Sequence, residues 1–192
     1  GSKAEVDCVM YATGRKPNTD GLGLDLAGVE LGAKGEIKVG DNSQTNVDNI
    51  YAVGDVTDRI ALTPVATMEG HAFADSLFGG NQRLPDHSNV ASAVFSQPPV
   101  ATVGLSEEQA RESHASVDTY TSDFKILKHT LTDNTERTLI KLVVDGESDK
   151  ILGAHMVGPD AAEIMQGIAI AVKMGARKAD FDATVGIHPS TA

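Results

Sequence analysis

Residues 49–55 read Asn-Ile-Tyr-Ala-Val-Gly-Asp, and this run is the clearest indication of fold class in the first half of the chain. Its β-branched and aromatic residues predict a strand buried on both faces, as in an α/β sheet. Gly54 and Asp55 stand where that strand stops. Open α/β sheets bind nucleotides at the carboxyl ends of their strands, so the Asp55 carboxylate is a candidate acceptor for sugar hydroxyls. A carboxylate that caps the next turn is the alternative interpretation.

Two other segments of this half also predict strands. Residues 6–12 form a short apolar run that ends at the turn-rich residues 13–18, and residues 35–39 alternate polar and apolar side chains. Cys8 is the only cysteine, which excludes an internal disulfide. We expect it to be a small buried hydrophobic residue within its strand.

A helix is predicted over residues 64–78. Thr63 is a favourable N-cap, Pro64 is favoured at the first helical position, and two glycines follow the helix. The start of such a helix presents free backbone N–H groups and a partial positive charge. The pattern alone is equally compatible with a helix that serves only for packing.

The polar residues 81–89 are the predicted domain boundary, and an α+β pattern follows them. Residues 138–144 and 151–157 predict a hairpin joined by a turn over residues 145–150. Capping boxes at residues 106–109 and 160–163 predict the starts of two helices, the second of which ends at Gly175.

Composition excludes several classes of function. With 192 residues and 41% hydrophobic residues, the chain has enough apolar material for one large or two small domains. A net charge of −11 with scattered basic residues argues against a nucleic-acid partner. Apolar runs fall far short of the ~20 residues that cross a bilayer, so we expect no membrane partner and a cytoplasmic location. The six histidines show no metal-ligand spacing, and we predict no metal.

Four separated segments resemble, in order and spacing, the glutathione-reductase-type flavoprotein disulfide reductases. These segments are ATGRKPN (residues 12–18), IYAVGD (50–55), LTPVA (62–66) and GIHPSTA (186–192). The resemblance implies an α/β plus α+β architecture, in which a remnant of the Rossmann-like FAD/NAD(P)-binding region precedes an α+β dimerisation domain. Its expected parts are the end of the NADPH-binding domain (1–17), the C-terminal, central part of the FAD-binding region (18–84) and the dimerisation domain (85–192).

The same resemblance implies roles for individual residues. Asp55, preceded by Gly54, would hold the ribityl chain of FAD. Leu62 would lie near the nicotinamide, and the amides of the helix starting at Thr63 would face the flavin pyrimidine edge. His188 would transfer protons during disulfide exchange, a reaction that needs a group titrating near neutral pH. The residues alone favour a structural role for a lone histidine.

The resemblance also implies an NADPH-dependent, homodimeric enzyme that reduces glutathione disulfide. Segment 62–66 resembles the glutathione and trypanothione reductases, so a related substrate of trypanothione, glutathione amide or dihydrolipoamide type stays open. The redox cysteine pair and both glycine-rich nucleotide loops of the family have no counterpart in these 192 residues. We therefore expect the chain alone to be inactive, and a catalytically silent dimerisation module is the alternative.

Overall fold

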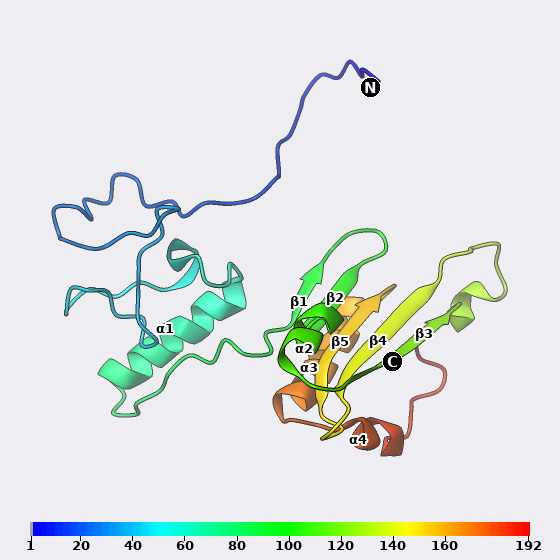
Figure 1. Ribbon diagram of the computed structural model, residues 1–192. Coiled ribbons are helices and arrows are strands. Elements are labelled where there is room, and N and C mark those ends of the chain that lie inside the picture. Colours follow the sequence, from blue (N-terminus) through cyan, green and yellow to red (C-terminus); the bar gives the residue numbers. More distant parts are fainter. Residues whose placement is uncertain (1) are drawn as a thin grey trace. The chain divides into compact units, whose positions relative to one another are not determined.

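The structure is a computed structural model that describes residues 2–192 and divides into two compact units. The first unit ends at His87 and the second comprises Ser88–Ala192, so the division falls within the polar segment 81–89 (Figure 1). No helix among the described residues is long and apolar enough to cross a membrane.

The first unit is largely irregular, and its strand predictions are wrong. Within residues 2–87 the segments 35–39 and 49–55 form only single bridges, between Leu31 and Ile37 and between Gln44 and Tyr51. A strand needs a neighbouring strand to satisfy alternate N–H and C=O groups, and these segments find none of any length here. Their apolar residues still pack, because Val29, Ile37 and Ala52 form a small core.

The predicted strand over residues 6–12 is also absent. Figure 1 shows this N-terminal segment, in blue, as an extended stretch without secondary structure. Its apolar side chains are exposed, and Cys8 is exposed as well, which corrects its predicted burial. An apolar run becomes a buried strand only where a sheet receives it, and no other described segment of the unit pairs with this one.

Helix α1 (Thr63–Leu77) confirms the predicted helix, although the predicted cap is wrong. Leu62 is the N-cap, with extended backbone, and no side chain caps the helix. Thr63 is already helical because the first intrahelical bonds go to the Leu62 carbonyl, from the N–H groups of Val65 and Ala66. A 3-10 turn, η1 (Gly54–Thr57), lies against α1.

The second unit is built on one antiparallel sheet of order β1-β2-β5-β4-β3 (Figure 1). The predicted hairpin is confirmed, with Leu142 opposite Ala154 and a bulge at Val143/Val144. The strands are β1 (Ser92–Val94), β2 (Val100–Gly104), β3 (Val117–Phe124), β4 (Thr138–Asp145) and β5 (Ile151–Val157).

Helices pack against this sheet and build its core. Helix α3 (Ala161–Lys173) packs on β2 and β5, where Met156 and Met165 are fully buried. The remaining helical elements are α2 (Glu107–Ser113), η2 (Leu127–His129) and α4 (Lys178–Ala183).

The two predicted capping boxes have different outcomes. At α2 both reciprocal bonds between Ser106 and Gln109 are present. At α3 Asp160 has a left-handed backbone (φ 64°) and its side chain makes no capping bond, so that prediction is wrong. The box requires an extended N-cap, which a left-handed residue does not provide. Gly175, at φ 78°, follows α3 as predicted.

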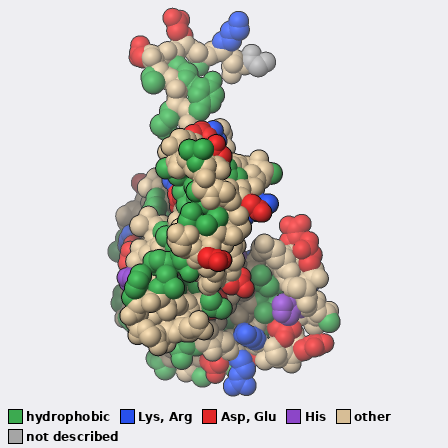
Figure 2. Space-filling model, turned by 90° about the vertical axis from the view of Figure 1, so that its left-hand side faces the viewer, with side chains coloured by type: hydrophobic (Ala, Val, Ile, Leu, Met, Phe, Trp, Pro, Cys, Tyr) green, Lys and Arg blue, Asp and Glu red, His purple; other side chains and the backbone are tan. Residues whose placement is uncertain are grey.

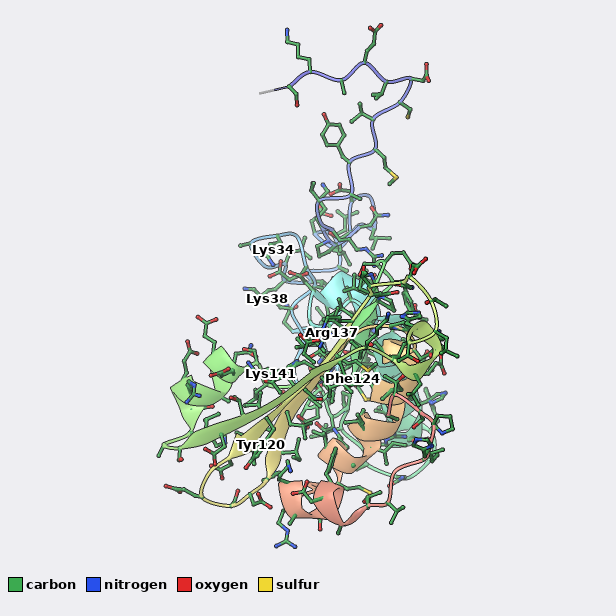
Figure 3. The ribbon with its side chains drawn as sticks, turned by 90° about the vertical axis from the view of Figure 1, so that its right-hand side faces the viewer. Lys34, Lys38, Tyr120, Phe124, Arg137 and Lys141 are labelled. Carbon is green, nitrogen blue, oxygen red and sulfur yellow. The ribbon has the colours of Figure 1, made fainter. Side chains whose placement is uncertain are left out.

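Ionic contacts tie α2 to the sheet. Lys141 of β4, labelled in Figure 3, places its ammonium 2.5 Å from the Glu107 carboxylate. The hydrogen bond from Lys141, and to a smaller extent that from Arg111, holds the pKa of Glu107 below its usual value.

A cation–π contact joins α4 to the sheet. The ammonium of Lys178 on α4 lies 4.5 Å from the ring centre of Tyr120 on β3.

Candidate functional site

Asp55 lies at the surface of the η1 turn in the first unit. Its side chain is 56% exposed, and one carboxylate oxygen lies 3.5 Å from the Arg15 guanidinium. Arg15 belongs to segment 12–18, so the fold brings two of the four sequence segments together. The pair is exposed and long, so its contribution to stability is small and the Asp55 oxygens remain open to other donors.

Gly54 brings the third segment into the same place. Its φ of +74° lies in the left-handed region, and a Cβ added there would stand 3.0 Å from the Cβ of Ala66. Its carbonyl accepts the Thr57 hydroxyl at 2.8 Å. Only glycine combines this backbone conformation with so close an approach to α1. Asp55 and the first turn of α1 are thereby neighbours.

The N-terminus of α1 offers fewer free donors than the sequence predicted. Val65 and Ala66 donate to the Leu62 carbonyl at 3.0 and 3.1 Å, and Pro64 has no N–H. The partial positive charge of a helix of 15 residues remains at this end. Leu62 is half-buried and Thr63 is exposed. The N-terminus of α1 therefore carries the positive end of the helix dipole next to the apolar Leu62, and no side chain caps it.

Glu69 is a component that the sequence analysis missed. Its side chain is 1% exposed, and its Oε2 accepts the Gly54 N–H at 2.6 Å. Its Oε1 lies 2.7 Å from Nε2 of His87 and 3.0 Å from a guanidinium nitrogen of Arg59. One signal was present: Glu69 stands four residues after Val65 and three before Ala72, on the face of α1 that is buried.

His188 lies in the second unit and is exposed. The chain around it is irregular and has a cis peptide bond to Pro189. The hydroxyl of Ser190 donates to the Ile187 carbonyl at 2.6 Å. Each unit is a separate body, so His188 belongs to a different part of the molecule from the Asp55 turn.

A cavity of about 630 Å³ lies beside the His188 segment. Its walls include Pro189 and Thr191, Ile164 of α3, and Phe124 at the end of β3, which is labelled in Figure 3. Lys125, Lys128 and Asp160 also line it, so its lining carries charges of both signs. Among residues 2–192, no group of His, Cys, Asp and Glu is arranged to hold a metal ion.

Comparison with known proteins agrees with this division of the chain. A family model described as pyridine nucleotide-disulphide oxidoreductase matches residues 1–70. The model of the dimerisation domain of the same family matches residues 90–192. The chain belongs to the pyridine nucleotide-disulphide oxidoreductases.

Individual members of the pyridine nucleotide-disulphide oxidoreductases are similar along the whole chain. Glutathione reductase of Burkholderia cepacia is 56% identical over 192 residues, which are 100% of this chain and 43% of that protein. Trypanothione reductase of Trypanosoma congolense is 45% identical over 193 residues, which are 100% of this chain and 39% of that protein. This chain thus spans about two-fifths of the length of these relatives.

A solved structure of the family is similar as well. The HOCl-induced flavoprotein disulfide reductase RclA from Escherichia coli superposes with a TM-score of 0.84 at 31% identity. The match covers 94% of this chain and 42% of that one.

Membership of this family implies that the protein binds FAD. Residues of the first unit have the chemistry to bind part of the FAD molecule. An open carboxylate at Asp55 suits hydroxyl donors, and the uncapped positive end of α1 suits an oxygen that becomes anionic. Gly54 keeps the turn free of side-chain bulk. Together these features are chemically compatible with part of a flavin.

Proposed function

We propose that this chain is part of an NADPH-dependent, FAD-containing reductase of glutathione disulfide that works as a homodimer. The observation that carries the proposal is the 56% identity to a glutathione reductase along the entire chain. The grouping of Asp55, Arg15 and the start of α1 in one unit supports it. The match of residues 90–192 to a dimerisation domain supports the homodimer.

In this proposal the first unit holds one side of the flavin. Asp55 accepts hydrogen bonds from the ribityl hydroxyls, and a charge-assisted bond of this kind is stronger than a neutral one. The helix start at Thr63 faces the pyrimidine edge and stabilises negative charge there through a fixed dipole. Leu62, just before this helix, lies near the nicotinamide-binding side. FAD, when bound, supplies the electron-transfer chemistry between NADPH and a disulfide.

His188 is the proposed acid and base. A disulfide is reduced when a thiolate attacks one sulfur and the other sulfur leaves as a thiolate. A ring nitrogen of His188 takes the proton from the attacking thiol and returns it to the leaving sulfur. Imidazole suits both steps because it titrates near neutral pH. In the homodimer this histidine serves the redox centre of the partner subunit.

The proposed domain parts follow the same assignment: 1–17 ends the NADPH-binding domain, 18–84 is the C-terminal, central part of the FAD-binding region, and 85–192 is the interface domain. We place the protein in the cytoplasm, where a reduced glutathione pool is maintained. No nucleic-acid partner is proposed, and on the face shown in Figure 2 the basic side chains (blue) are scattered and form no continuous patch.

The test is an assay of the full-length protein that contains this chain. NADPH oxidation is measured with glutathione disulfide, trypanothione disulfide and lipoamide in parallel, and glutathione disulfide should give the highest kcat/KM. A preference for trypanothione disulfide would favour the second candidate, which the 45% identity to a trypanothione reductase supports. Absence of turnover with all three, in a dimeric protein without flavin, would instead favour a silent dimerisation module.

A further inference from the structure

A fully buried carboxylate lies beneath the Gly54–Asp55 turn. Glu69 projects from α1 with a side chain 1% exposed, whereas glutamates are almost never fully buried unless they are paired. Burying an unpaired carboxylate costs much free energy, because the group loses its hydration. The contacts of Glu69 with its neighbours compensate for that loss.

Glu69 joins three separate segments of the first unit. Its Oε2 accepts the Gly54 N–H at 2.6 Å, which is a short charge-assisted bond. Its Oε1 contacts Arg59 at 3.0 Å and His87 at 2.7 Å. Arg59 also donates to the Ser43 hydroxyl at 3.1 Å. The Gly54 N–H therefore donates to a carboxylate whose other oxygen is held by Arg59 and His87.

The Gly54 peptide groups are held at both ends, whereas the Asp55 side chain is not. Glu69 holds the Gly54 N–H, and the Thr57 hydroxyl holds its carbonyl at 2.8 Å. Asp55 follows directly, is 56% exposed, and has only the exposed 3.5 Å contact to Arg15. Its direction is thus set by the backbone of the turn, which the buried side chains of Glu69 and Thr57 hold in place.

We propose that Glu69 is a positioning residue for the flavin site, which orients Asp55 through the Gly54 N–H without touching the flavin. This inference rests on the proposed function, because it concerns the same site. It assigns a function to the bond from Gly54, whereas the contacts with Arg59 and His87 pair the same carboxylate within the unit.

The test is a double-mutant cycle on FAD affinity in the full-length protein. Glu69→Ala should raise the dissociation constant of FAD about tenfold, equivalent to about 1.4 kcal/mol. Asp55→Ala should raise it as well. If Glu69 acts through Asp55, adding Glu69→Ala to Asp55→Ala should cause little further loss, so the two effects should be far from additive. FAD binding to the apoprotein is followed by flavin fluorescence.

Two further variants separate positioning from general stability. Glu69→Gln keeps an oxygen that can accept the Gly54 N–H and should restore most of the affinity. Ala72→Gly, at a buried position of the same helix, should lower the melting temperature and leave FAD affinity unchanged. If Glu69→Ala does not fold, Glu69→Asp takes its place in the cycle, because it keeps the charge and withdraws the carboxylate from Gly54.

The possible failures are distinguishable. A wild-type protein that binds no FAD contradicts the proposed function itself. A wild-type protein that binds FAD, together with additive losses for Glu69 and Asp55 variants, overturns only the positioning role. Unchanged FAD affinity in a folded Glu69→Ala or Glu69→Asp variant overturns it as well.

Discussion

Asp55 combines an exposed carboxylate with a backbone that directly follows the buried, hydrogen-bonded Gly54. Its partner Arg15 lies 3.5 Å away with a side chain that is 77% exposed, so water screens the pair. The carboxylate is therefore available to a ligand without the cost of breaking a strong internal contact. The neighbouring Gly54 supplies the rigid part of the turn through its bonds to Glu69 and Thr57.

We predict that Asp55→Asn in the full-length protein retains more FAD than Asp55→Ala. Asparagine keeps one oxygen acceptor but loses the charge, and a hydrogen bond to a charged group contributes about 1.5–3 kcal/mol against about 1 kcal/mol for a neutral one. Flavin content after dialysis should fall in the order wild type, Asp55→Asn, Asp55→Ala. Equal flavin content in all three proteins would show that Asp55 is no ligand and only terminates the turn.

For His188 we predict that glutamine slows disulfide reduction by about 10²- to 10⁴-fold in the full-length protein, the usual range for loss of a general acid. Reduction of the flavin by NADPH should continue at the parental rate, because that half-reaction needs no proton from this histidine. Rapid-mixing absorbance separates the two half-reactions. A His188→Gln enzyme that reduces disulfide at the parental rate would make the exposed histidine a surface residue without catalytic role.

The pairing of β2 with β5 depends on glycines where the two backbones come closest. A Cβ at Gly153 would stand 2.0 Å from the Leu105 carbonyl oxygen, and one at Gly104 would stand 2.2 Å from that of Leu152. Both obstacles are backbone atoms, so neither yields by a side-chain rotation. Neither Gly104 nor Gly153, which lie opposite one another in the β2–β5 pair, can therefore be replaced by a residue with a side chain without moving the backbone.

At the level of these elements we predict opposite effects for two glycine-to-alanine changes. Gly153→Ala should destabilise the chain by several kcal/mol, because β2 and β5 must separate to admit the methyl group. Gly167→Ala, in α3 with nothing within 4 Å of the added Cβ, should stabilise it by roughly 0.5–1 kcal/mol. Urea unfolding measures both. Equal changes in the free energy of unfolding would contradict the close approach at Gly153.

The two units of the molecule have separate cores. The first contains the small cluster around Ile37, and the second contains the larger cluster between α3 and the sheet. The connecting residues 81–84 are exposed. Each unit therefore has the separate hydrophobic core that is expected of a domain.

We predict that limited trypsin digestion leaves the second unit as a stable fragment that begins close to residue 84. Arg83 is exposed, and its bonds to Asp75 and Ser76 lie at the surface, so little buried structure must open before it is cleaved. Mass spectrometry of a time course identifies the first stable product. Early cuts within β4 or β5, for instance at Lys141, would contradict an independent second unit.

A second prediction for the whole molecule concerns cofactor binding by the 192-residue chain. It should bind FAD far more weakly than the full-length protein, since the chain spans about 43% of its glutathione reductase relative and carries only one side of the proposed site. Equilibrium dialysis against FAD checks this. Tight stoichiometric binding would show that Asp55 and the start of α1 suffice.

Features that depend on neighbours within a few residues were predictable from the sequence. Helix α1, the Ser106 capping box and the β4–β5 hairpin follow from local periodicity, capping and turn residues, which act over one or two turns of chain. The same local patterns in segments 6–12 and 49–55 did not become strands, because a strand exists only with a hydrogen-bonded partner. Local pattern carries no information about that partner.

The candidate site shows the same limit. Asp55, Gly54 and the start of α1 were recognisable as sequence segments, and their proximity came from the left-handed turn at Gly54 against Ala66. The sequence analysis did not single out Glu69, although it lies on the same face of α1 as Val65 and Ala72. Its burial depends on Gly54, Arg59 and His87, which lie ten to eighteen residues away along the chain. A buried charge is stable only when its partners converge on it, and that convergence is a property of the folded chain.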